Sequence, residues 1–326
     1  MLTRRALLAA SLGATLGGCA ASMAPPDAAP TPPDAEAFVM PDGAHLPCRS
    51  WLPNGPPEAV VLALHGFNDS RDAWEIPAAD FTAAGFALYA PDQRGFGAAP
   101  GRGRWPGIDT LVGDAAEMAA QVRRRHPSAR FILLGESMGG AVAMCLATGP
   151  RAPADASYVL VAPAVWGRAR MNAILRSGLW LASTMAPGLA LTGAPVRVVA
   201  SDNRAALIRL SRDPLTIHAT RFDTLRGLVD LMDAALVAAA SFTAPGLFLY
   251  GGKDDLVPKG AMAAMWRTLP DGGARRAYYP SDYHLMLRDL GRALPVADIM
   301  AWVRDRRATL PSGAGQAAAD WLTRQA

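Results

Sequence analysis

The sequence predicts an α/β fold built on a mostly parallel β-sheet, and three observations lead to this prediction. Continuous apolar runs recur along the chain, as at residues 59–64 and 86–90, and such runs are typical of strands covered on both faces. Stretches with helical apolar spacing lie between them, as at residues 109–125. With 326 residues, of which 51% are hydrophobic and 18% charged, the chain can bury a sizeable core.

Eight apolar runs are predicted to form the strands of this sheet. An Asp-Gly turn between the first two runs predicts a hairpin. The predicted strands are residues 37–40, 46–51, 59–64, 86–90, 131–134, 158–164, 246–250 and 275–279. After the sixth strand the alternation of strands and helices stops until about residue 243, so we expect a helical insertion there.

Charge and cysteine content exclude several classes of protein. The formal net charge is +4, and about +2 remains without the two arginines of a predicted leader, with mixed signs throughout. Nothing in this balance indicates nucleic-acid binding, so we expect no nucleic-acid partner. The three cysteines form no short-spaced pair, which argues against a disulfide framework or a zinc site, and a bond between Cys48 and Cys145 is disfavoured.

Residues 1–18 have the pattern of a secretory signal. A basic start precedes a short apolar stretch that cannot span a bilayer. The run Leu-Gly-Gly-Cys at 16–19 resembles a bacterial lipobox, which implies that Cys19 is lipidated and that the protein is anchored to the cell envelope. Ala20 then favours the outer membrane, facing the periplasm. An ordinary signal peptide is the alternative, and the general secretory and twin-arginine routes both stay open.

The remaining chain divides by composition into four parts. Residues 19–35 are mostly Ala, Pro and Asp, and such a segment acts as a stiff tether rather than a core. The predicted α/β core comprises residues 36–164 and 244–310, with the insertion at 165–243 as a cap. Residues 311–326 form a tail, either a short helix or a frayed end.

The pentapeptide Gly-Glu-Ser-Met-Gly at 135–139 lies between a predicted strand and a predicted helix. A Gly-x-Ser-x-Gly in this context forms the sharp turn called a nucleophile elbow. The turn leaves no room for side chains at Gly135 and Gly139, and it lifts the Ser137 hydroxyl to a helix N-terminus. By itself the pentapeptide is a weak signal, because a Gly-rich turn with a surface serine has the same pattern.

Three further motifs follow predicted strands, one before the elbow in the chain and two after it. His65-Gly66-Phe67 follows the run 59–64, Gly-Gly-Lys-Asp-Asp-Leu-Val-Pro occupies residues 251–258, and His284 follows the last predicted strand. Together with the elbow, these motifs resemble those of the monoacylglycerol lipase and lysophospholipase group of α/β-hydrolases, also labelled serine-aminopeptidase-like. The resemblance covers residues 36–310.

The resemblance implies a catalytic triad of Ser137, Asp254 and His284, without a metal or an organic cofactor. Asp255 is the alternative acid, which the spacing from Gly251 disfavours. The resemblance also implies an oxyanion hole formed by the backbone N–H groups of two residues, Phe67 and Met138. It gives supporting roles to the remaining motif residues, which are His65, Gly66, Gly135 and Gly139.

Two further segments carry expectations about the pocket. The run Asp-Gln-Arg-Gly-Phe-Gly at 92–97 also resembles the family, and we expect an ion pair between Asp92 and Arg94 at the pocket floor. In the insertion, Trp166, Met171 and Trp180 are candidate pocket residues. The apolar face predicted near residues 171–181 either packs down over the cleft or faces lipid as an entry for acyl chains.

The sequence therefore predicts a serine hydrolase that cleaves carboxylic esters of monoacylglycerol- or lysophospholipid-like lipids through an acyl-enzyme. A peptidase, amidase or acyltransferase on the same triad is the first alternative, and a lipid- or partner-binding surface lipoprotein without turnover is the second. A dehalogenase or epoxide hydrolase is disfavoured, because those relatives carry Asp where this chain has Ser137. Acyl-chain preference and oligomeric state stay open.

Overall fold

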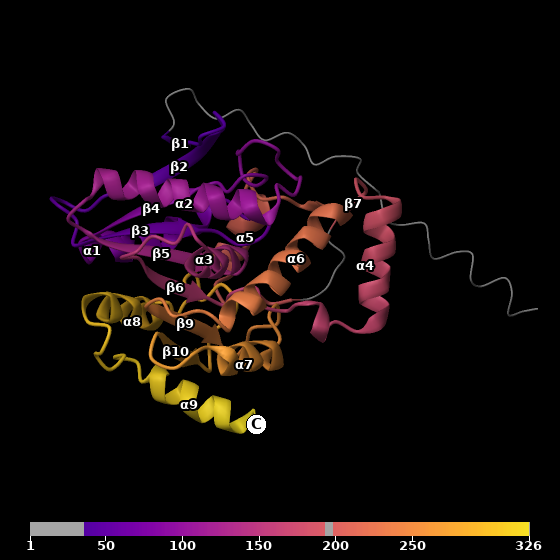
Figure 1. The fold of residues 1–326 in the computed structure, drawn as a ribbon. Helices are drawn as coiled ribbons and strands as arrows, with labels where there is room; N and C mark the ends of the chain where they lie inside the picture. The colour runs from indigo at the N-terminus through magenta and orange to yellow at the C-terminus, as the bar shows by residue number, and fades with distance from the viewer. Residues whose placement is uncertain (1–35, 193–197, 326) are drawn as a thin grey trace, which may run out of the picture.

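The computed structural model describes residues 36–192 and 198–325, which form an eight-stranded sheet with helices on both faces (Figure 1). The strands lie in the order β1-β2-β4-β3-β5-β6-β9-β10. Their bounds are β1 Ala37–Val39, β2 His45–Trp51, β3 Ala59–Leu64, β4 Phe86–Pro91, β5 Arg130–Glu136, β6 Ser157–Val161, β9 Gly246–Gly251 and β10 Ala274–Tyr279. The β1–β2 and β2–β4 pairs are antiparallel and the other five pairs are parallel, so the predicted mostly parallel, eight-stranded sheet is confirmed.

The helices complete an α/β/α arrangement. Their bounds are η1 Arg71–Trp74, α1 Glu75–Ala83, α2 Ile108–Arg125, α3 Met138–Thr148, η2 Arg168–Arg170, α4 Ala173–Met185, α5 Arg204–Arg212, α6 Phe222–Ala239, α7 Lys259–Thr268, α8 Ala293–Arg304 and α9 Ala314–Arg324. The strands β7 Ala190–Thr192 and β8 Ala219–Arg221 form a separate antiparallel pair.

Alternate side chains of the central strands belong to two hydrophobic cores, one on each face of the sheet. In β3, Val60 and Leu62 pack with α2 and α3, whereas Val61 and Ala63 pack with α1 and α8. All six residues of β3 are buried, as expected for a strand covered on both faces. The carboxyl ends of β3, β5, β6, β9 and β10 therefore meet at one edge, where ligands of such sheets bind.

The segment between β6 and β9 contributes no strand to the large sheet in its described residues. Within it, α6 packs on α3, and α4 packs on α6 and stands farthest from the sheet (Figure 1). The large apolar side chains of α4 point outward, with Ile174 85% and Met185 75% exposed. The interpretation that the apolar face near residues 171–181 packs down over the cleft is thus wrong for α4. The spacing of apolar residues predicts an apolar helix face, but it does not show which surface that face contacts.

Several sequence predictions concern residues that fall outside the described ones. The leader 1–18, Cys19 and the tether 19–35 lie outside them. Within residues 36–192 and 198–325, no helix has the length and apolar character needed to cross a membrane, and no group of three His, Cys, Asp or Glu side chains could hold a metal ion. Cys48 and Cys145 are free thiols.

Candidate active site

Ser137 lies on a strained turn between β5 and α3. Its φ of 52° is in the left-handed region, which non-glycine residues rarely adopt. The Ser137 N–H donates to the Val161 carbonyl at 2.9 Å, and the Ser137 carbonyl accepts from the Ala164 N–H at 2.9 Å. These bonds from the end of β6 hold the turn, so the surrounding sheet enforces a conformation that the backbone would not choose by itself.

The two glycines of the elbow are required by close backbone approaches. A Cβ atom at Gly135 would lie 2.4 Å from the Gly139 carbonyl oxygen, and one at Gly139 would lie 2.2 Å from the Leu64 carbonyl oxygen. Both distances are shorter than any real contact, so only glycine lets β3, β5 and α3 come together here. At Gly66 a Cβ would make an ordinary 3.5 Å contact with the Ser137 Cβ, so space alone does not require glycine there.

His284 is buried in the loop after β10 and is bonded to the acid turn after β9. Its Nδ1 lies 2.8 Å from Asp254 Oδ2. The other oxygen, Asp254 Oδ1, accepts the N–H groups of Leu256 and Val257 at 2.8 and 2.9 Å. Both oxygens of the Asp254 carboxylate are therefore held by hydrogen bonds. Asp254, and not the exposed Asp255, contacts His284.

The environment of His284 favours its protonated form. Burial by itself lowers the pKa of His284, but attraction and hydrogen bonding by Asp254, with a smaller contribution from Glu136, outweigh it and raise the pKa above its ordinary value. A histidine with this environment can take a proton from a nucleophile and hold it as a stabilised imidazolium.

Ser137 and His284 line the same cavity, of about 280 Å³, at the carboxyl edge of the sheet. Its walls are mostly apolar, and they include Trp166 at the start of the insertion and Leu228 and Met232 of α6. The other two predicted pocket residues lie elsewhere. Met171 and Trp180 line a separate cavity of about 410 Å³ between η2, α4 and α6, together with arginines 168, 176 and 226.

The two predicted oxyanion donors border the elbow. Met138 is the first residue of α3, so its N–H has no acceptor within the helix. Phe67 lines the same cavity as Ser137, and within the described part of the chain its N–H donates to no backbone or side-chain acceptor. Both N–H groups thus remain available for a developing oxyanion.

His65 supports the loop after β3 and takes no part in the Ser137 cavity. Its Nδ1 lies 2.8 Å from the Gly66 carbonyl oxygen, and its Nε2 accepts the Gln93 N–H at 3.0 Å. The Gln93 amide returns a bond to the His65 carbonyl at 2.8 Å. Because Nε2 accepts, Nδ1 carries the hydrogen, and the ring ties the β3 and β4 loops together.

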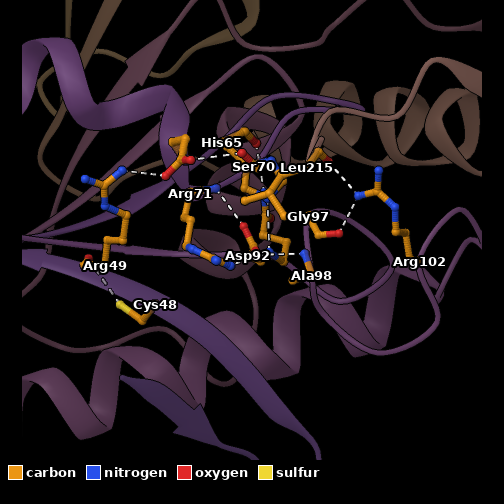
Figure 2. A network of polar contacts seen from close by, with 12 residues as sticks. Cys48, Arg49, His65, Ser70, Arg71, Asp92, Gly97, Ala98, Arg102 and Leu215 are labelled. Carbon is orange, nitrogen blue, oxygen red and sulfur yellow. Dashed lines mark hydrogen bonds and ion pairs between the residues drawn. The ribbon is translucent and has the colours of Figure 1, made fainter. Parts of the chain in front are cut away.

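The expected ion pair between Asp92 and Arg94 is wrong. Asp92 is fully buried and pairs with Arg71, and it also accepts the N–H groups of Arg71 and Ala98 at 2.7 Å each (Figure 2). Arg94 turns the other way and bonds Asp114 and Asp42. A separation of only two residues suggests the pair, but the partner of a buried carboxylate is set by tertiary packing, which here brings Arg71 of η1 to Asp92.

The insertion is bonded directly to the loops around the site. The Asn68 carbonyl accepts the Ile217 N–H at 2.9 Å, and the Asn68 amide donates to Thr220 Oγ1 at 2.6 Å. The Arg102 guanidinium donates to the carbonyls of Gly97 and Leu215 and so joins the loop after β4 to the insertion (Figure 2). Residues 214–220 are thereby attached to the segment that carries Phe67.

Sequence reasoning missed one buried group of charges beside the elbow. Arg288 Nη2 donates to Asp69 Oδ2 and to Glu136 Oε1, both at 2.8 Å. The signal that could have found it is an arginine at the end of the apolar run Leu-Met-Leu that follows His284, since a charge at the end of a buried run needs a partner.

These features define a class of protein. A serine elbow after β5, an acid turn after β9 and a histidine after β10 lie at one edge of a mostly parallel sheet, in the order Ser, Asp, His along the chain. This is the arrangement of the α/β-hydrolases.

Comparison with known proteins identifies the family. The chain belongs to the family described as Serine aminopeptidase, S33, whose model matches residues 55–291, and it is a serine hydrolase. It is 28% identical to the monoacylglycerol lipase of Mycolicibacterium smegmatis over 82% of this chain and 95% of that one. It is 26% identical to the human monoglyceride lipase, over 85% and 92% of the two chains. Its fold matches that of a Saccharomyces cerevisiae monoglyceride lipase with a TM-score of 0.69 and 19% identity, over 86% of this chain and all of that one.

Proposed function

We propose that the protein hydrolyses carboxylic esters with Ser137 as nucleophile, His284 as general base and Asp254 as the group that orients it. The observation that carries the proposal is the 2.8 Å contact of His284 Nδ1 with Asp254, beside a cavity that His284 and Ser137 both line. Within the described part of the chain, the opposite ring nitrogen of His284 makes no hydrogen bond and is left for the Ser137 proton. A hydroxyl is a poor nucleophile at neutral pH and needs such a base.

In this mechanism His284 Nε2 takes the Ser137 proton as the hydroxyl attacks the ester carbonyl. The N–H groups of Phe67 and Met138 stabilise the oxyanion, and imidazolium formation is favoured by the Asp254 carboxylate. The imidazolium then protonates the departing alcohol, which leaves an acyl-enzyme. A water molecule, activated by the same histidine, releases the acid and restores Ser137.

The proposed substrates are amphiphilic esters of the monoacylglycerol or lysophospholipid kind. The mostly apolar cavity supports this choice, because an acyl chain gains free energy on leaving water for such a surface. The exposed apolar side chains of α4 support contact with a lipid interface, and the names of the M. smegmatis and human relatives agree with a monoacylglycerol.

We further propose that Cys19 is lipidated and anchors the protein to the cell envelope. Mass spectrometry of the mature N-terminus would test this proposal.

The test is hydrolysis of p-nitrophenyl esters from acetyl to palmitoyl, and of a monoacylglycerol and a lysophospholipid, by the wild type and by Ser137→Ala. We expect Ser137→Ala to lose activity by a factor of at least about 10⁴ while its melting temperature stays near that of the wild type. Ser183→Ala, which removes a serine of α4 outside the Ser137 cavity, is the matched control and should keep activity.

The alternatives predict different results. An activity optimum at medium or long acyl chains supports a lipid esterase, whereas activity confined to acetyl and butyryl esters rejects lipid substrates. Turnover of amino-acid p-nitroanilides in preference to every ester would favour the peptidase activity that the family's description names. A protein that neither turns over esters nor reacts with a phosphonate at Ser137 would be a binding lipoprotein, and the proposal would fail.

A further inference from the structure

Arg288 joins three chain segments that converge on the site. Its Nη2 donates to Asp69 Oδ2, in the loop after β3, and to Glu136 Oε1, at the end of β5, both at 2.8 Å. The partners are 219 and 152 residues away from Arg288 in the chain. Glu136 directly precedes Ser137, and Arg288 follows His284 by four residues, so each partner belongs to a segment with an assigned role in ester hydrolysis.

Stability does not account for this cluster. The three side chains are almost completely buried, at 6% exposure for Arg288, 8% for Asp69 and 1% for Glu136. Apolar side chains of the same volume usually stabilise a core at least as well as such a group, because the ions lose their hydration. In the described part of the chain, Glu136 Oε2 and Arg288 Nε also have no hydrogen-bond partner, so the cluster is incompletely satisfied.

The cluster also acts on His284 by charge. Burial and the Arg288 charge oppose the protonated form of His284, whereas Asp254 and, to a smaller extent, Glu136 favour it. The net effect raises the pKa of His284 above its ordinary value. Glu136 and Arg288 therefore act on the histidine in opposite directions. Glu136 itself lines the Ser137 cavity.

We infer that Arg288 and Glu136 are positioning residues of the site: Arg288 holds the β3 loop, the elbow and the histidine loop in register, and the Glu136 carboxylate stabilises the imidazolium of His284. The inference rests on the proposed ester hydrolysis. Neither residue contacts the reacting atoms, so each acts through Ser137, His284 or the Phe67 N–H.

The first test is the pH dependence of kcat/KM for the best p-nitrophenyl ester. Glu136→Gln keeps the size of the side chain and an oxygen that can accept from Arg288, but it removes the charge. The acid limb of the profile should therefore move to lower pH by about half a unit to one unit. Arg288→Met removes the opposing charge and should move the same limb to higher pH.

The second test separates positioning from charge. Arg288→Met should lower kcat about 100-fold or more with little change in KM, because the loops lose their common anchor. Arg288→Lys should stay within about tenfold of the wild type, since one nitrogen of Arg288 makes both bonds and an ammonium nitrogen can also donate twice. Arg94→Met is the matched control: Arg94 bonds Asp42 and Asp114, outside the site, and its loss should not move the acid limb.

If Arg288→Met does not fold, Glu136→Gln and Arg288→Lys still decide the question. An unmoved acid limb in Glu136→Gln, or a loss in Arg288→Lys as large as in Ser137→Ala, overturns the inference. Ester hydrolysis that survives in Ser137→Ala overturns instead the proposed function, and the two failures are thereby told apart.

Discussion

The approach of Gly139 to Leu64 makes Gly139→Ala a sharp test of how the elbow is built. A Cβ at this position would lie 2.2 Å from the Leu64 carbonyl oxygen and 2.8 Å from the Leu64 Cβ. Real Cβ contacts are never shorter than 3.0 Å, so the elbow and the end of β3 must separate by about 1 Å. The loop that carries the Phe67 N–H starts at this point, so the oxyanion donor moves relative to Ser137.

We expect Gly139→Ala to lower the free energy of unfolding by about 1–3 kcal/mol, the usual cost of overpacking a core. A misplacement of about 1 Å should reduce kcat/KM about 100-fold or more. Thermal unfolding and ester hydrolysis measure the two effects. Gly178→Ala is the matched control, because a Cβ at Gly178 of α4 meets nothing within 4 Å, and alanine there should stabilise the helix slightly. A Gly139→Ala protein with wild-type stability and kcat/KM would refute the reasoning.

Two further predictions concern carboxylates of the late loops. Asp254→Asn should lower kcat by about 10⁴, because His284 loses the group that sets its tautomer. Asp255→Asn changes an exposed side chain and should alter kcat less than about threefold. Equal losses in the two variants would contradict the assignment of Asp254. Burial and the neighbouring Asp289 and Asp202 raise the pKa of Asp282 to about 7. The folded state therefore binds a proton that the unfolded state releases above pH 4, so this carboxyl's stabilising contribution falls as the pH rises from about 4 to 7. Asp282→Asn should raise the free energy of unfolding at pH 8 by about 2 kcal/mol and flatten its pH dependence between pH 4 and 7. Urea titrations at pH 4 and at pH 8 would show whether it does.

The strands and the elbow could be predicted because their signals are local. Runs such as Ala59–Leu64 are apolar at every position, and only a strand covered on both faces requires this. In the same way, the glycines at 135 and 139 mark a turn whose crowding is a property of a few neighbouring residues. The chain order of the serine, acid and histidine motifs then limited the folds that could bring them together.

The sequence predictions that failed all concern which side chains are in contact in the folded protein. The sequence suggests Arg94, two residues away, as the partner of Asp92, but Asp92 pairs with Arg71, which follows another strand. Met171 and Trp180 belong to an apolar pattern, yet the pattern does not show on which side of α6 they lie. Arg288 was missed because its partners are more than 150 residues distant, and no period in a single sequence connects them.

The bonds of Asn68 to Ile217 and Thr220 bear on any attempt to redesign this enzyme. Exchanging the insertion for that of a relative is an obvious route to a new substrate range, because it forms much of the cavity wall. Residues 214–220, however, also brace the backbone next to Phe67, so a chimera that replaces them would change the catalytic rate together with the specificity. Graft boundaries that leave 214–220 in place would let the two properties be varied separately.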